Sequence, residues 1–136
     1  MSTEPRLDPP PTYEIDDVLR VIGKAVLDKH ASHIRIVDLT EIVSYADAVV
    51  MVSGQNDRQV LAIVDHVEHE MRTQLGLKSK GVEGKNTAAW VCMDYGDVIV
   101  HVFYAPARDY YDLDSLWPDG NERSEELLKG LDVDPE

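Results

Sequence analysis

Apolar residues recur three and four positions apart in two long stretches of the chain, the pattern of helices that bury one face. The first stretch covers about residues 12–29. The second follows a cap at Ser53 or Asn56, carries Asp57 where the helix dipole favours an acid, and stops naturally at Gly76. We therefore predict two amphipathic helices, with the apolar stripes Ile15, Val18, Leu19, Ile22, Ala25 and Val26, and Val60, Ile63, Val64, Val67, Met71 and Leu75.

Strand patterns lie between and after these helices. Residues 33–39 approximate the alternation of a strand, whereas the continuous apolar run at residues 49–52 is typical of a strand buried on both faces and central in its sheet. Residues 78–86 favour a loop with a short strand at Val82, and Pro106 favours the start of a short last helix. One side of that helix would carry Tyr110, Leu113, Leu116 and Trp117, and we interpret the cluster of Tyr110, Tyr111 and Trp117 as core.

The stretch WVCMDYGDVIVHVF, residues 90–103, predicts a hairpin with two chemically different faces. Around a two-residue turn at Tyr95 and Gly96, Asp94 would pair with Asp97, and Trp90 with His101. These four paired residues then share a face that suits a partner, and the opposed carboxylates call for a cation because like charges destabilise a pair by up to about 1 kcal/mol. A solvated turn is the alternative interpretation. The other face is wholly apolar and should pack on the core, through Val91, Met93, Val98, Val100 and Val102.

The order of these elements predicts a single α/β domain over residues 13–117, with a small mixed β-sheet flanked by helices. Three consecutive prolines, Pro9 to Pro11, predict a disordered Pro-rich arm over residues 1–12. Residues 118–136 are acidic and poor in apolar side chains, which predicts a disordered tail with at most a frayed helix near Glu125.

The chain is strongly acidic, with a formal net charge of −13 from 13 basic and 26 acidic residues. Nucleic-acid binding neutralises phosphates with Lys and Arg, so this balance argues against RNA or DNA as the main contact and favours a basic protein partner. Cys92 is the single cysteine and cannot form an intramolecular disulfide, which is compatible with a reducing compartment. The N-terminus lacks a targeting signal and no apolar run approaches the roughly 18 residues of a membrane span, so we expect a soluble, cytoplasmic protein.

Several separate motifs resemble those of the ribosomal silencing factor family, RsfS, also called Iojap-like. They are DYGDVIVHVF at residues 94–103, ARDYYDLDSLW at residues 107–117, DAVVMVSGQNDRQVLAIVDHVE at residues 47–68 and GVEG at residues 81–84. The resemblance covers roughly residues 15 to 117 in consistent order. It implies a small mixed sheet of nucleotidyltransferase-like topology.

The resemblance also implies a function. A member of this family would bind the large ribosomal subunit through the ribosomal protein uL-fourteen, block joining of the small subunit and repress translation when nutrients are scarce. Combining the hairpin face with the family pattern, we expect the partner-binding residues to be Glu83, Trp90, Asp94, Tyr95, Asp97 and His101. Whether the free protein forms a homodimer stays open.

An enzymatic alternative follows from the same kinship, namely a metal-dependent nucleotidyltransferase-like enzyme. Ser53 and Gly54 form a strand-to-helix turn that could cradle an anion, but the carboxylates Asp112 and Asp114 lie far along the chain and no Lys or Thr accompanies the turn. We therefore expect no catalysis and no cofactor. His66 and His69 share a helix at a spacing that metal ligation allows, yet we interpret them as solvated surface histidines and expect no metal site.

Overall fold

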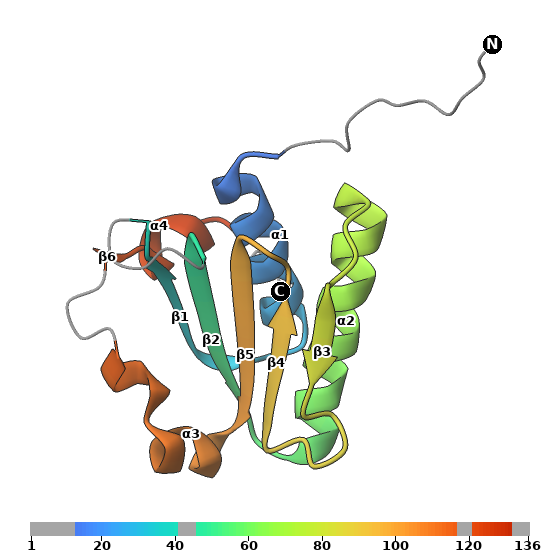
Figure 1. The fold of residues 1–136 in the computed structure, drawn as a ribbon, viewed down its shortest axis with the longest axis vertical. Helices are drawn as coiled ribbons and strands as arrows, with labels where there is room; N and C mark the ends of the chain where they lie inside the picture. The colour runs from blue at the N-terminus through green and yellow to red at the C-terminus, as the bar shows by residue number, and fades with distance from the viewer. Residues whose placement is uncertain (1–12, 41–45, 117–120, 132–136) are drawn as a thin grey trace.

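The computed structural model describes residues 13–40, 46–116 and 121–131, which form a mixed six-stranded sheet with helices on both sides (Figure 1). The strand order is β3-β4-β5-β2-β1-β6, with β2 and β5 parallel and every other pair antiparallel. The elements are α1 (Ile15–Asp28), β1 (Ser32–Asp38), β2 (Ala48–Gly54), α2 (Asp57–Leu75), β3 (Gly81–Glu83), β4 (Trp90–Asp94), β5 (Val98–Tyr104), α3 (Ala105–Tyr111), the short 3-10 helix η1 (Leu113–Leu116), β6 (Asn121–Glu122) and α4 (Ser124–Leu128). The predicted single α/β domain with a mixed sheet is confirmed.

Helices α1 and α2 lie together on one face of the sheet and bury it (Figure 1). Both predicted apolar stripes are correct, because every stripe residue except the half-buried Ile15 is buried in this core. The side chain of Asn56 accepts the N–H of Gln59 and caps α2, and Gly76 ends it with a left-handed φ of 67°. No helix within the described parts of the chain is long and apolar enough to cross a membrane.

Strand β2 is the centre of the sheet, as its continuous apolar run predicts. All seven of its residues are buried, and it lies between β5 and β1. Its alternate side chains therefore supply two cores. Val50 and Val52 face α1 and α2, whereas Val49 and Met51 join a smaller core on the opposite side with Val37, Leu39 and Phe103.

The predicted last helix is interrupted. Helix α3 ends at Tyr111, the following residue Asp112 has a left-handed φ of 52°, and the chain continues as η1. Tyr110 is 82% exposed and Tyr111 is 50% exposed, so the interpretation of these tyrosines as core is wrong. None of the seven residues of α3 is buried, so this short helix has no buried face on which either ring could lie. Trp117, the third member of that cluster, lies outside the described residues.

Part of the expected acidic tail folds onto the domain. Strand β6 pairs with β1, and α4 packs on α1 with Leu127 fully buried. Arg123 anchors this segment through two hydrogen bonds of 2.7 and 3.0 Å to the carboxylate of Asp16. Residues 121–131 are therefore structured, contrary to a disordered tail beginning at residue 118, while the predicted Pro-rich arm lies outside the described residues.

Candidate functional site

The hairpin of β4 and β5 turns one residue later than its sequence suggests. Asp94 pairs with Ile99 and Trp90 with Phe103, so Gly96 and Asp97 form the turn, and Gly96 has the positive φ of 85° that hairpin turns favour. The predicted pairs Asp94–Asp97 and Trp90–His101 are wrong. The register shift is two residues, however, and a shift of two leaves the side chains of both strands on their predicted faces. Only the turn residues change, because Asp97 enters the turn and Tyr95 leaves it.

The hairpin face is the side of the sheet opposite α1 and α2, where β3, β4 and β5 carry Glu83, Trp90, Asp94, His101 and Phe103. At its centre lies an aromatic cluster. The half-buried Trp90 ring lies 5.2 Å from the Phe103 ring and 4.9 Å from the Tyr111 ring between centroids, and its Nε1–H donates a 3.0 Å hydrogen bond to Nδ1 of His101. The tryptophan is thus held in one orientation with part of its surface exposed.

His101 supports Trp90 and offers little surface to a partner. Its residue is only 9% exposed, and burial lowers the pKa of its imidazole to about 4. Because Nδ1 accepts the hydrogen bond from the Trp90 N–H, the neutral imidazole carries its own proton on Nε2. The two residues therefore have different roles: His101 orients the Trp90 ring, and Trp90 can contact a partner.

The three predicted acidic contacts differ in their surroundings. Glu83 and Asp97 are exposed, on β3 and at the hairpin tip respectively. Asp94 is half-buried and accepts the backbone N–H of Gly96 at 2.8 Å, so it shapes the turn that it precedes. Because Asp94 does not oppose Asp97, the expected like-charge repulsion is not what defines this tip.

Tyr95 points to the opposite side of the hairpin from Trp90. Its ring packs against the core formed with α1 and α2, and its hydroxyl oxygen is buried. Burial raises the pKa of Tyr95 to about 12. The geometry therefore gives Tyr95 a structural role in fixing the hairpin on the core.

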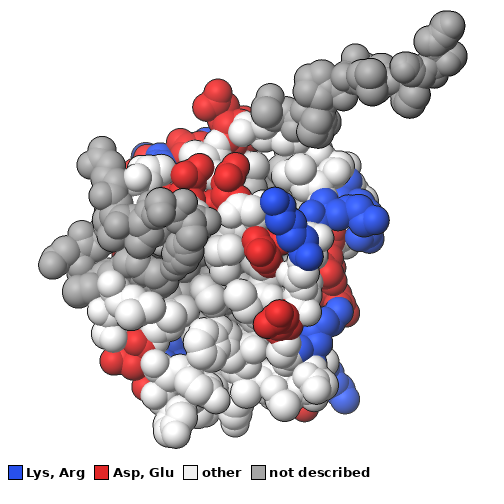
Figure 2. Space-filling view, in the orientation of Figure 1, with Lys and Arg blue, Asp and Glu red and all other residues white. Residues whose placement is uncertain are grey.

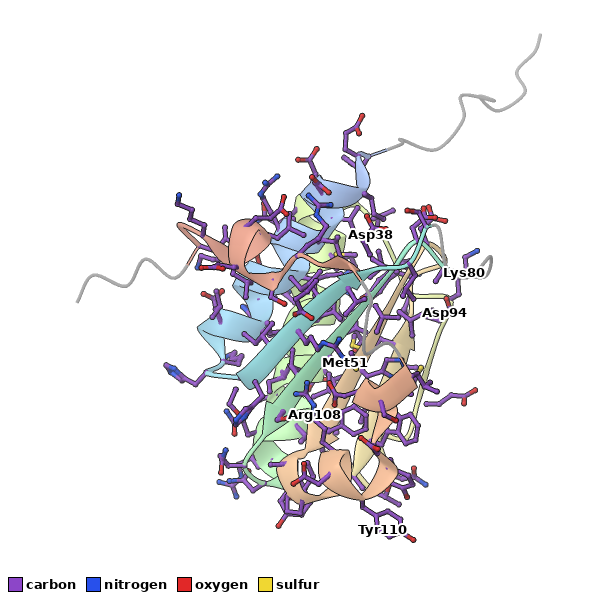
Figure 3. The ribbon with its side chains drawn as sticks, turned by 90° about the vertical axis from the view of Figure 1, so that its left-hand side faces the viewer. Asp38, Met51, Lys80, Asp94, Arg108 and Tyr110 are labelled. Atoms are coloured by element: carbon purple, nitrogen blue, oxygen red, sulfur yellow. The ribbon has the colours of Figure 1, made fainter. Side chains whose placement is uncertain are left out.

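Exposed apolar side chains extend the hairpin face beyond the residues that the sequence singled out. Tyr110 projects outward at one end of the molecule (Figure 3), and Leu116 on η1 is 60% exposed. Figure 2 shows a largely uncharged surface over β4, β5 and α3, with acidic and basic side chains around it. The Tyr111 ring contacts both Trp90 and Tyr110, and with Leu116 these residues make an aromatic patch of the residue types that are enriched in protein-binding sites.

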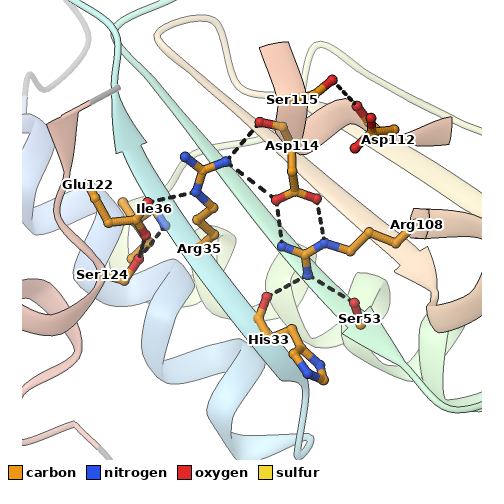
Figure 4. Close-up of polar contacts among 10 residues, drawn as sticks. All are labelled: His33, Arg35, Ile36, Ser53, Arg108, Asp112, Asp114, Ser115, Glu122 and Ser124. Carbon is orange, nitrogen blue, oxygen red and sulfur yellow. Dashed lines mark hydrogen bonds and ion pairs between the residues drawn. The ribbon is translucent and has the colours of Figure 1, made fainter. Parts of the chain in front are cut away.

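A polar cluster lies beside this patch, where α3 and η1 meet β1 and β2 (Figure 4). The guanidinium of Arg108 donates two hydrogen bonds, of 2.9 and 3.0 Å, to the two carboxylate oxygens of Asp114. Its Nη1 also donates to the hydroxyl of Ser53 at 2.9 Å. Arg35 contacts the same carboxylate at 3.5 Å from the other side. The Arg108 hydrogen bond, opposed by burial, holds the pKa of Asp114 below its usual value.

The turn at Ser53 and Gly54 is occupied by groups of the chain itself. The Ser53 hydroxyl receives Arg108, and the next backbone N–H, of Gln55, donates to the side chain of Gln59. Asp114 is close to this turn but is paired with two arginines, so its charge is already neutralised. Within the described ranges, no three His, Cys, Asp or Glu side chains group in a way that could hold a metal ion.

The histidines of α2 join neighbouring helices or stack on each other. His66 lies 3.0 Å from the carboxylate of Asp28 and so links α2 to α1. The rings of His66 and His69 stack with centroids 6.3 Å apart. Their observed contacts are those of helix-surface residues.

Comparison with known proteins places this geometry in a family. Residues 12–135 match the family described as ribosomal silencing factor during starvation. The ribosomal silencing factor RsfS of Bacillus subtilis is 37% identical over 102 residues, covering 75% of this chain and 86% of that protein. A crystal structure from Chromobacterium violaceum superposes with a TM-score of 0.74 at 31% identity, covering 77% of this chain and 87% of that one. A mouse relative named mitochondrial assembly of ribosomal large subunit protein 1 is 27% identical, over 82% of this chain and 51% of its own length. The chain belongs to the ribosomal silencing factor family, RsfS.

Proposed function

We propose that this protein binds the large ribosomal subunit through the ribosomal protein uL-fourteen and acts there as a translational repressor. By occupying the surface where the small subunit joins, it lowers translation when nutrients are limiting. The observation that carries the proposal is the aromatic patch around Trp90 on the hairpin face, which also presents the exposed acid Glu83, with the exposed Asp97 at the hairpin tip. Such a site binds by occupancy and needs no covalent chemistry, and its place of action is the cytoplasm.

The chemistry of the surface favours a protein partner over RNA. Partly exposed Trp and Tyr side chains are typical anchors of protein interfaces, where removing one can cost 2 kcal/mol or more. The acidic neighbours and the net charge of −13 repel phosphates at long range and attract basic protein surface. We infer that Trp90 packs on the partner while Glu83, Asp97 and the outer side of Asp94 face its Lys and Arg side chains.

Substitution of Trp90 tests the contact directly. We expect Trp90→Ala to weaken binding to isolated uL-fourteen and to whole large subunits by at least about tenfold, roughly 1.4 kcal/mol. Tyr13→Ala is the matched control, because Tyr13 is also exposed but lies just before α1. Isothermal titration with purified uL-fourteen and co-sedimentation with large subunits measure the effect. Tight binding of naked rRNA that ignores Trp90→Ala would contradict the proposal.

Charge reversal tests the acidic rim separately. Glu83→Lys combined with Asp97→Lys changes two exposed side chains and should weaken binding to a basic partner strongly, with a steeper effect at low salt. Asp17→Lys combined with Asp65→Lys changes the net charge equally on α1 and α2, behind the sheet, and should bind nearly normally. If both double variants lose affinity equally, the effect is one of net charge and the assigned rim is wrong.

A further inference from the structure

The segment that carries Tyr110, Tyr111 and Leu116 has few apolar anchors. Every residue of α3 and η1 is described, and none of them is buried. Leu113 packs partly on the smaller core and the tilted Tyr111 ring contacts Trp90, but the hydrophobic effect scales with buried area and both residues are only partly covered. Packing alone therefore gives this segment little to fix its position on the sheet.

Polar contacts supply the missing anchor. Asp114 on η1 lies between Arg108 on α3 and Arg35 on β1, and the side chains of the two arginines are only 11% and 19% exposed. Arg108 also donates to the backbone oxygen of His33 and to the Ser53 hydroxyl, so its guanidinium joins α3, η1, β1 and β2. Arg35 extends the connection to β6 through a 2.7 Å hydrogen bond with Glu122. Forked arginine–carboxylate pairs of this kind fix direction as well as distance.

We propose that Arg35, Asp114 and Arg108 form a positioning clamp that holds the α3–η1 segment in the conformation that presents the aromatic patch to the ribosomal partner. The clamp determines where Tyr111 contacts Trp90, and it fixes the positions of Tyr110 and Leu116. These three residues do not contact the partner themselves. They act by positioning the residues that do. The role of the clamp in binding rests on the proposed function. Its role in holding the α3–η1 segment concerns the free protein alone.

A second ion pair in the same molecule provides a matched comparison. Asp16 and Arg123 also form a forked pair, and their side chains are 34% and 16% exposed, close to the 32% and 11% of Asp114 and Arg108. That pair fixes α4 near α1, away from Trp90. Asp114→Asn and Asp16→Asn therefore remove equivalent charges from equivalent pairs, and only the first touches the clamp.

Trp90 fluorescence tests positioning without any partner. The chain has two tryptophans, so Trp117→Phe leaves Trp90 as the only indole that reports. In this background Asp114→Asn should shift the Trp90 emission to longer wavelength and increase its quenching by acrylamide, because Tyr111 no longer covers the ring. Amide hydrogen exchange in residues 105–116 should accelerate. Asp16→Asn should leave both signals at the parent values, and Asp114→Glu should restore them in part. Unchanged emission and exchange in Asp114→Asn would overturn the clamp.

Binding to isolated large subunits tests what the clamp is for, in the chain with Trp117 retained. Asp114→Asn should lose about tenfold or more in affinity, while Asp16→Asn should bind as the parent does. If Asp114→Asn moves the segment and Trp90→Ala loses binding, yet Asp114→Asn binds normally, the positioning role is refuted and the proposed function stands. If Trp90→Ala binds normally, the proposed function fails, and the fluorescence and exchange data still decide whether the clamp holds the segment.

Discussion

The buried imidazole of His101 should make the protein lose stability as the pH falls from about 6.5 to about 4. In the folded protein His101 is 9% exposed and its pKa is lowered to about 4 by burial, whereas an unfolded chain gives histidine its ordinary value of about 6.5. Between these two values the unfolded state binds a proton that the folded state does not. The free energy of unfolding therefore rises with pH across this window, and lowering the pH through the window decreases it.

The magnitude follows from the size of the pKa difference. Each unit corresponds to about 1.4 kcal/mol, so the contribution of His101 to the free energy of unfolding should fall by about 3 kcal/mol between about pH 7 and about pH 4. Protonation would also end the hydrogen bond from Trp90, because Nδ1 could no longer accept it. The same pH change should therefore loosen the Trp90 ring.

Urea unfolding at a series of pH values measures this effect when His101→Gln is compared with the parent. Glutamine offers an oxygen that can accept the Trp90 N–H and does not titrate. The carboxylates, including Asp114 with its lowered pKa, titrate in both proteins and cancel in the difference. The stability advantage of the parent over His101→Gln should shrink by about 3 kcal/mol on acidification. A difference that stays constant from pH 7 to pH 4, or an NMR titration of His101 near its ordinary pKa, would refute the reasoning.

Two further pairs of substitutions test the helices that support the site. Asn56→Ala removes the side chain that caps α2 and should lower the free energy of unfolding by about 1 kcal/mol in urea titration, whereas Asn56→Asp should retain most of it. Leu127→Ala should cost about 2–5 kcal/mol, because Leu127 is fully buried between α4 and the core, while Leu128→Ala, at a half-buried position, should cost less. A neutral Leu127→Ala would show that α4 does not belong to the cooperative unit.

The sequence by itself determined the elements whose burial repeats with a regular period. The stripe from Val60 to Leu75 predicts a helix with one buried face, the run at residues 49–52 favours a strand with two, and both elements are present. It also divided the hairpin correctly into an apolar face and a face with Trp90, because side chains alternate whatever the pairing. The family motifs pointed to the same surface, since the motif at residues 94–103 includes the turn and the second strand of that hairpin.

Tertiary structure decided everything that depends on which residues meet across the chain. The register of the hairpin was set by the positive φ at Gly96 and by Asp97, whose carbonyl accepts two N–H groups at the start of β2. The hairpin face combined with the family pattern had assigned His101 and Tyr95 to the contact surface, but packing buried the first beside Trp90 and turned the second toward the helices. The clamp of Arg35, Asp114 and Arg108 joins positions 79 and 6 residues apart, which no local pattern could bring together. The periodicity of a segment predicts which of its faces is buried. Which other segment of the chain covers that face depends on the whole tertiary structure.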